Sequence, residues 1–91
     1  EKIQKSVCDH FKISFEDIKS KKRNRNYIIP RQMAMYLCRE MTDQSLPEIG
    51  KLFGGKDHTT ILHSWKKIQK EVSGDSPIKN TIDRIIAEIH Q

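Results

Sequence analysis

Apolar residues recur along this 91-residue chain at the three- and four-residue spacing of amphipathic helices. Ile3, Val7 and Phe11 predict a first helix, and Ser14 predicts the N-cap of a short second one over 15–18. Near the C-terminus, Ser76 and Pro77 predict a helix start, followed by isoleucines at helical spacing: Ile78, Ile82, Ile85, Ile86 and Ile89. No stretch alternates between apolar and polar residues as a strand would. The pattern predicts an all-α bundle of five or six helices.

The middle of the chain predicts a third helix that opens at Pro30, in its first turn, and runs to Met41. Its predicted buried stripe consists of Met33 or Ala34, Leu37, Cys38 and Met41, while Arg31, Gln32 and Arg39 lie elsewhere on the cylinder. Before this helix, residues 20–26 contain no apolar side chain and are rich in Asn and Ser, which favour loops.

Residues 45–68 contain two helix starts separated by a Gly-Gly break. Ser45 and Glu48 have the spacing of a capping box, and Pro47 sits in the first turn. Gly54 and Gly55 predict the end of that helix. Asp57 is the predicted N-cap of a longer helix with Trp65 as its core anchor, and its apolar face is Ile61, Leu62, Trp65, Ile68 and Val72. A short helix, a Gly turn and a longer helix predict a helix-turn-helix over about 45–72.

Composition and charge favour one small domain, 1–91, that meets a polyanion. Hydrophobic residues make up 35% of the chain and charged residues 32%, with a net charge of +5. From Lys19 to Lys67 there are eleven basic and four acidic residues, a net of +7, against −2 for the rest. The densest cluster lies in a basic loop over about 19–27, where five of the seven residues from Lys19 to Arg25 are cationic. The alternative is a merely solvated basic loop.

Several other function classes fit the sequence poorly. Residues 50–56 match the phosphate-loop pattern G-x-x-x-x-G-K, but Asp57 follows where that motif needs Ser or Thr, and a helix precedes it instead of a strand. Cys8 and His10 are two apart and His58 and His63 five apart, so neither pair shares a helix face as metal ligands would. No arrangement of nucleophile, base or paired carboxylates can be assigned, so we expect no enzyme activity.

The cysteine content and the chain ends add three expectations. Cys8 and Cys38 both fall in helical patterns and are expected to be reduced, buried or half-buried thiols. No apolar run approaches the ~20 residues that cross a bilayer, and no signal peptide is visible. Because the chain opens on Glu1 and not Met, we expect it to be a domain excised from a longer protein.

The side chains at the start of the second helix of the helix-turn-helix suit base edges in a major groove. A carboxylate such as Asp57 can accept from cytosine N4, the His58 imidazole can donate to a purine N7, and Thr59 and Thr60 offer hydroxyl and methyl groups. The alternative is that Asp57 is only an N-cap and that the threonine hydroxyls satisfy first-turn amides.

Three segments together carry a resemblance to a known family. PRQMAMYLCREMT (30–42), SLPEIG (45–50) and FGGKDHTTILH (53–63) closely resemble the C-terminal DNA-binding domain, domain IV, of the bacterial chromosomal replication initiator family DnaA. The resemblance implies a helical bundle with a helix-turn-helix like that of the Trp repressor, bound to nonameric DnaA boxes in double-stranded DNA at the replication origin. It implies a cytoplasmic, nucleoid-associated protein. ATP and Mg²⁺ would bind only a separate AAA+ ATPase module of the parent protein.

The resemblance also implies roles for individual residues. Base-reading positions are Arg23 in the minor groove, Asp57, His58 and Thr59 in the major groove, and Leu46 and Pro47 against thymine methyl groups. Phosphate-binding positions are Lys22, Asn24, Arg25, Arg31, Gln32, Ser45, Lys56, Thr60, Lys66 and Lys67. The chain departs from familiar enterobacterial members in the loop, KKRNRN for KRRSRS, and at Lys56, which is Arg there.

Other readings stay open at this point. The helix-turn-helix could belong to a transposase or transcriptional repressor, or the basic face could dock an acidic protein. A repressor would be expected to dimerise on a palindrome, whereas we expect one monomer of this domain on each box. The parent protein would oligomerise on the origin, with regulatory proteins as further partners.

Overall fold

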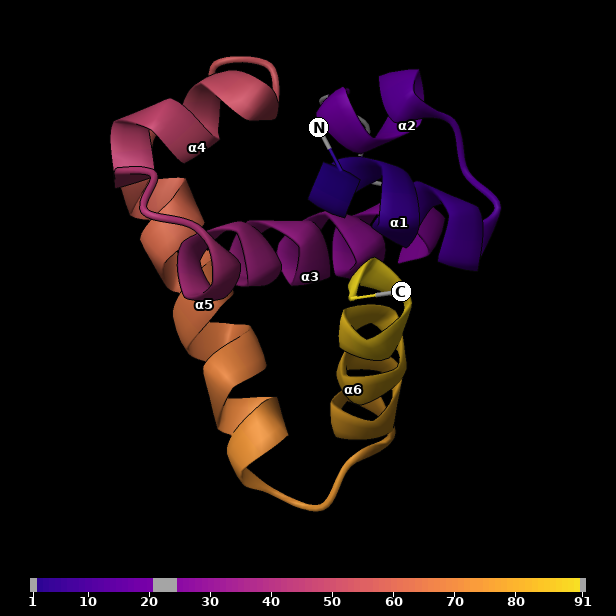
Figure 1. The fold of residues 1–91 in the computed structure, drawn as a ribbon. Coiled ribbons are helices and arrows are strands. Elements are labelled where there is room, and N and C mark those ends of the chain that lie inside the picture. The colour runs from indigo at the N-terminus through magenta and orange to yellow at the C-terminus, as the bar shows by residue number, and fades with distance from the viewer. Residues whose placement is uncertain (1, 21–24, 91) are drawn as a thin grey trace.

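The structure is a computed structural model that describes residues 2–20 and 25–90. In this part of the chain six helices and no strand are present: α1 (Lys2–Phe11), α2 (Phe15–Lys19), α3 (Arg25–Met41), α4 (Leu46–Leu52), α5 (His58–Ser73) and α6 (Pro77–Ile89) (Figure 1). The predicted all-α class is confirmed. None of these six helices is both long enough and apolar enough to cross a membrane.

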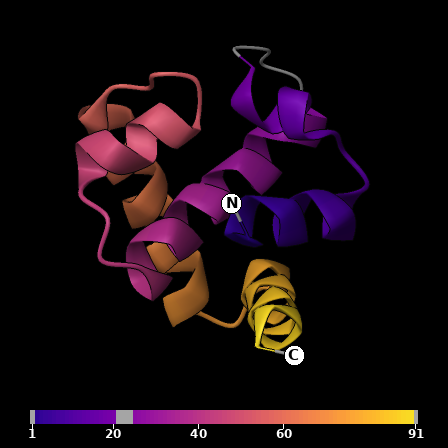
Figure 2. The same ribbon diagram turned by 45° about the horizontal axis from the view of Figure 1, so that its top comes forward.

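Helix α3 is the central element of the bundle. It crosses the molecule with α1 and α2 against one end and α4 and α5 against the other, while α6 packs on α1 and α5 (Figures 1 and 2). Its side chains are buried on most of its circumference: Pro30, Arg31, Met33, Ala34, Met35, Tyr36, Leu37 and Cys38. The predicted stripe was therefore too narrow, and Met41 is only half-buried. A helix enclosed on most sides gives the helix-turn-helix a rigid support.

The start of α3 differs from the prediction. The helix begins at Arg25, so Pro30 lies inside it and not in its first turn, and Arg25 and Asn26 are helical instead of looped. Pro30 is the sixth residue of this helix and has no N–H group, so it cannot donate to the carbonyl of Asn26, four residues earlier. The extension therefore costs a single backbone hydrogen bond, and it places Ile29 against the core.

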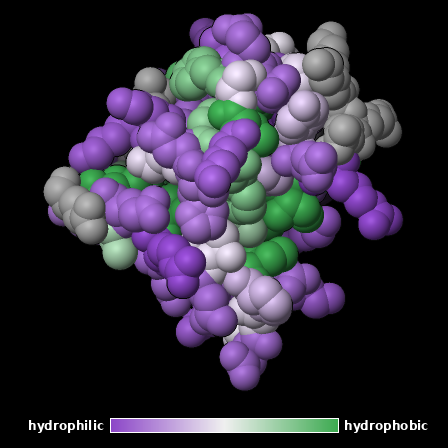
Figure 3. Space-filling model, turned by 90° about the vertical axis from the view of Figure 1, so that its right-hand side faces the viewer, coloured by the Kyte–Doolittle hydropathy of each residue, from purple (hydrophilic) through white to green (hydrophobic). Residues whose placement is uncertain are grey.

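The other helix starts follow their local signals. Ser14 Oγ accepts from the backbone N–H of Asp17 at 3.0 Å, and Ser76 Oγ accepts from that of Lys79 at 3.4 Å. Helix α6 buries Ile82, Ile85 and Ile89, with Ile78 and Ile86 half-buried beside them. On the side shown in Figure 3, hydrophilic residues cover most of the surface and apolar residues show as small areas between them, as expected where apolar stripes face inward.

Both cysteines are free thiols inside the core, which confirms the prediction. Cys8 is 6% exposed and Cys38 fully buried. Burial raises the pKa of the Cys8 thiol, and its Sγ donates weakly to the carbonyl of Ser14 at 3.7 Å. Both residues therefore act as small apolar groups.

Gly50 determines how the turn between α4 and α5 closes. Its carbonyl accepts backbone N–H groups from Phe53 at 3.1 Å, Gly55 at 3.0 Å and Lys56 at 2.9 Å. A Cβ atom at Gly50 would lie 2.1 Å from the Lys56 carbonyl oxygen. Gly54 and Gly55 both have φ near +80°, a conformation that favours glycine. The glycines that imitate a phosphate loop thus serve a tight interhelical turn that follows a helix.

We expect Gly50→Ala to lower the free energy of unfolding by roughly 2–4 kcal/mol, because the added methyl group must displace backbone at Lys56. Urea denaturation followed by circular dichroism measures the change. Gly74→Ala is the matched control, since the nearest atom to its Cβ would be 3.8 Å away, and we expect a change within about 0.5 kcal/mol. Equal stability of the two variants would contradict the role of Gly50.

Candidate nucleic-acid interface

The first helix of the helix-turn-helix starts with a complete capping box. The backbone N–H of Glu48 donates to Ser45 Oγ at 3.2 Å, and the backbone N–H of Ser45 donates to Glu48 Oε1 at 3.0 Å. The hydrogen bond from the Ser45 backbone N–H, followed by one from the Ser45 side chain, lowers the pKa of the Glu48 carboxyl. Pro47 is exposed in the first turn, whereas Leu46 is half-buried against the core. The predicted start of α4 is confirmed.

The tip of α5 presents four exposed polar side chains at its N-terminal end: Asp57, His58, Thr59 and Thr60. Asp57 Oδ1 accepts from the backbone N–H of Thr59 at 3.0 Å, which confirms the predicted N-cap. The same oxygen lies 3.2 Å from His58 Nδ1. Both side chains remain about two-thirds exposed, Asp57 at 66% and His58 at 63%. Capping therefore engages one oxygen of Asp57 and leaves the tip accessible to a ligand.

The core face of α5 is narrower than predicted. Ile61 and Ile68 are buried together with Ser64, while Leu62 and Val72 are half-buried. The predicted core anchor Trp65 lies instead at the edge of the core: the guanidinium of Arg39 sits 4.2 Å from its ring centroid, and its Nε1 donates to Glu40 Oε2 at 3.3 Å. Polar side chains of α3 therefore contact this ring. The spacing of apolar residues along α5 could not predict this contact, because the partners lie on another helix.

A hollow between α3 and α5 collects several predicted phosphate-binding residues. It has a volume of about 480 Å³ and is lined by Ile28, Arg31, Gln32, Met35, Lys56, Thr60 and Ser64. Arg31 and Gln32 come from α3, Lys56 from the turn and Thr60 from the first turn of α5, so residues 29 apart in sequence share one site. Sequence reasoning missed Ser64, although it lies four residues after Thr60 and therefore on the same side of the helix.

Arg31 lines this hollow but is also bonded inside the protein. It is 7% exposed; its Nε donates to the Ile18 carbonyl at 3.1 Å, and its Nη2 donates to the Asp17 carbonyl at 3.2 Å and to Ser20 Oγ at 3.4 Å. Burial lowers its pKa from the usual value. Among the described residues these bonds engage Nε and Nη2 but not Nη1. Arg31 can therefore join α3 to the end of α2 and still offer one nitrogen to an anion.

The remaining predicted phosphate-binding residues that the structure describes do not line this hollow. Ser45, Lys66, Lys67 and Arg25 are exposed. Lys22, Arg23 and Asn24 lie outside the described residues, so the predicted minor-groove position and two phosphate positions have no placement here. The described positions combine cationic groups with hydroxyl and amide donors, the groups that bind phosphate oxygens.

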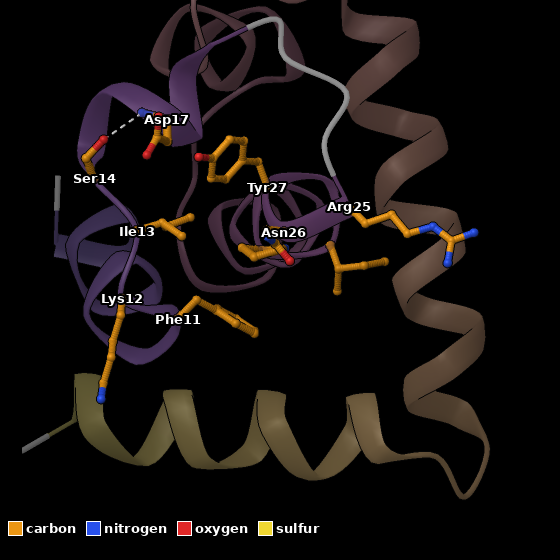
Figure 4. Close-up of a pocket in the computed structure, with 10 residues that line it drawn as sticks. Phe11, Lys12, Ile13, Ser14, Asp17, Arg25, Asn26 and Tyr27 are labelled. Carbon is orange, nitrogen blue, oxygen red and sulfur yellow. Dashed lines mark hydrogen bonds between the residues drawn. The ribbon is translucent and has the colours of Figure 1, made fainter.

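A second hollow of about 490 Å³ lies beside the first turn of α3. Its lining comes from the end of α1, the connection to α2, α2 itself and α3, with Phe11 and Tyr27 among the side chains around it (Figure 4). Arg25 also lines this hollow, with its guanidinium pointing away from the other labelled side chains. The described residues contain no cluster of three or more His, Cys, Asp or Glu that could hold a metal ion. The two hollows share no lining residue, and Arg25 is the only predicted site residue among the described residues that line the second.

Comparisons with known proteins agree with this geometry. A family described as "Bacterial dnaA protein helix-turn-helix" matches residues 1–68. The chain is 54% identical over 98% of its length to the chromosomal replication initiator protein DnaA of Geotalea daltonii, and 52% identical over 89% of its length to that of Lactobacillus helveticus. It spans only 20% and 18% of these two proteins. A crystal structure of a DNA replication initiation factor matches 96% of this chain and 26% of its own, with a TM-score of 0.84 and 33% identity.

We expect Arg31→Lys to lower the free energy of unfolding by about 1–3 kcal/mol, because one ammonium group cannot replace the fork that binds the carbonyls of Asp17 and Ile18. Urea denaturation of the isolated domain measures the effect. Arg25→Lys makes the same change on the same helix at an exposed position, and its effect should stay within about 0.5 kcal/mol. A loss of the same size in both variants would remove the bonding role of Arg31.

Proposed function

The chain belongs to the family of bacterial DnaA helix-turn-helix domains, and from this premise we propose that it binds DnaA boxes in double-stranded DNA at the replication origin. It would act in the bacterial cytoplasm, on the nucleoid. The observation that carries the proposal is the exposed polar tip of α5, which adjoins the hollow lined by Arg31, Gln32 and Lys56. The groups that would read bases are thus adjacent to groups that would bind phosphates, which supports the proposal.

The tip of α5 would read the major groove. Its exposed groups include one carboxylate acceptor, one imidazole and two threonines with hydroxyl and methyl groups, which match the donor, acceptor and methyl pattern of base pairs. The capped start keeps these side chains at the leading end of a helix, the end that enters the groove in helix-turn-helix proteins. Leu46 and Pro47, at the start of α4, would contact thymine methyl groups.

The hollow between α3 and α5 would hold the sugar-phosphate backbone. Arg31 and Lys56 supply positive charge there, and Gln32 and Thr60 supply neutral donors. Arg25, Ser45, Lys66 and Lys67 would bind further phosphates on the exposed surface. Contacts of this kind fix the orientation of the protein on the duplex without reading its sequence.

The basic loop would supply the minor-groove half of recognition, with Arg23 as the reader and Lys22 and Asn24 on phosphates. This assignment rests on the resemblance of the loop to the family and on its density of cationic residues. A narrow A·T-rich minor groove has an enhanced negative potential that attracts an arginine.

Other properties belong to the whole protein. The relatives are about five times as long as this chain, so we assign ATP and Mg²⁺ binding, origin opening and oligomerisation to the parent protein. This domain would occupy each box as a monomer, without a cofactor and without catalysing a reaction.

Binding to box-containing duplex should depend strongly on salt. If roughly 5–8 phosphates are contacted, a plot of log K against log salt concentration should have a slope of about −5 to −7. Fluorescence anisotropy of a labelled duplex between low and moderate salt measures this slope. A slope near zero would remove the electrostatic part of the proposal.

His58→Ala should reduce the preference for box over scrambled duplex by about 1–3 kcal/mol, because a base contact is lost. Lys67→Ala should weaken binding to both duplexes by the same factor, since a phosphate contact carries no sequence information. The measured quantity is the ratio of the two dissociation constants at one salt concentration.

His63→Ala is the matched control for this test. It makes the same substitution on the same helix, five residues along and therefore about 140° around the axis from His58. Its selectivity should equal that of the unaltered domain. If His58→Ala keeps full selectivity, the tip serves only to cap α5. If the domain binds an acidic protein more tightly than either duplex, a protein-interaction module is favoured.

A further inference from the structure

Gln4 is a polar residue on the buried side of α1 that the function proposed above does not use. It is 1% exposed, less than any other buried polar residue of the described chain. Its Nε2 donates to the backbone carbonyl of Leu52 at 2.6 Å, across 48 residues of sequence. Burying a carboxamide is costly unless it is hydrogen-bonded, so this bond offsets part of the cost of burying the Gln4 side chain.

The Leu52 carbonyl belongs to the last residue of α4. The last four carbonyls of a helix have no partner within the helix and need one from outside. The Gly50 carbonyl is satisfied by the turn itself, and the Leu52 carbonyl is satisfied by α1 through Gln4. Helix α1 thereby holds the point at which the chain leaves α4 and begins the turn toward the tip of α5.

The same turn also touches the end of α2. A Cβ at Gly54 would lie 2.6 Å from the Lys19 carbonyl, so the two backbones approach closely there. Arg31 holds the carbonyls of Asp17 and Ile18 from the other side. Lys19 is the residue from which the chain enters the basic loop. Gln4 thus bonds the end of α4, the turn after α4 approaches the end of α2 at Gly54, and Arg31 bonds that same end of α2; we call these contacts the junction.

We propose that Gln4 is a positioning residue that sets the turn before α5, and with it the tip of α5, against α1, and so determines selectivity for the box without touching DNA. This inference rests on the proposed function, because it needs a tip that reads bases. A tip that reads bases while other groups bind phosphates tolerates little displacement relative to those groups, and bonded groups behind it hold it in place.

The test substitutes Gln4→Met, which keeps the length and most of the volume of the side chain but cannot donate to Leu52. The dissociation constants for box and scrambled duplex are measured well below the unfolding temperature, and circular dichroism confirms the helix content. We expect affinity for the box to fall about tenfold, since an unsatisfied buried carbonyl costs enough to let the turn shift. Affinity for scrambled duplex should change less than about twofold, because exposed phosphate contacts are retained.

Gln69→Met is the matched control. Gln69 is a half-buried glutamine on α5 whose Oε1 has no hydrogen-bond partner among the described residues, so its substitution removes a carboxamide away from the junction. Its box selectivity should be unchanged. If Gln4→Met does not fold, Gln4→Asn takes its place, because it keeps the amide but is one methylene too short to reach Leu52, and the same loss of selectivity is expected.

A double-mutant cycle with His58→Ala separates positioning from a general loss of stability. If Gln4 acts by placing the tip, Gln4→Met should lower affinity for the box about tenfold in the unaltered domain. In His58→Ala, where one proposed base contact is already absent, the same substitution should lower that affinity less than about threefold. Additive losses, or equal weakening of both duplexes, would overturn the inference. An unaltered domain with no box preference would instead overturn the proposed function, whereas preference retained in Gln4→Met would overturn the positioning role alone.

Discussion

The arrangement of the helix-turn-helix depends on one contact, the close packing of the Lys56 carbonyl against α4 at Gly50. Any side chain at this position would overlap that oxygen, and the Gly50 carbonyl gathers three backbone N–H groups from the turn. The contact determines how closely the turn folds back on α4. It thereby determines the position of Asp57, the residue that caps α5. The direction of the tip therefore follows from a glycine that presents no group to a ligand.

Two buried polar side chains extend this constraint to the rest of the bundle. Arg31 and Gln4 donate to the ends of α2 and α4, where helix carbonyls lack partners in their own helix. Desolvating such groups offsets much of the energy that their bonds contribute, so apolar residues could serve stability as well. What a hydrogen bond adds is direction and distance. It fixes one helix end relative to another, which apolar contact alone does less sharply.

Local physics made most of the helix-turn-helix readable from the sequence. The capping box at Ser45, the glycines of the turn and the N-cap at Asp57 act over three or four residues, and all three are present as predicted. The start of α3, the edge position of Trp65 and the burial of Arg31 were not foreseen. Each depends on which distant element lies opposite, and spacing along the chain does not carry that information.

The same division explains why the exposed residues proposed to read bases were easier to predict than the groups behind them. A side chain that meets a ligand must carry suitable chemistry at a helix tip, and Asp57 and His58 show this in the sequence itself. A group that only holds the tip in place can be any residue whose donor reaches the right carbonyl, as Gln4 does across 48 residues. If the tip of α5 reads bases as proposed, such groups contribute to recognition by limiting how far the tip can move.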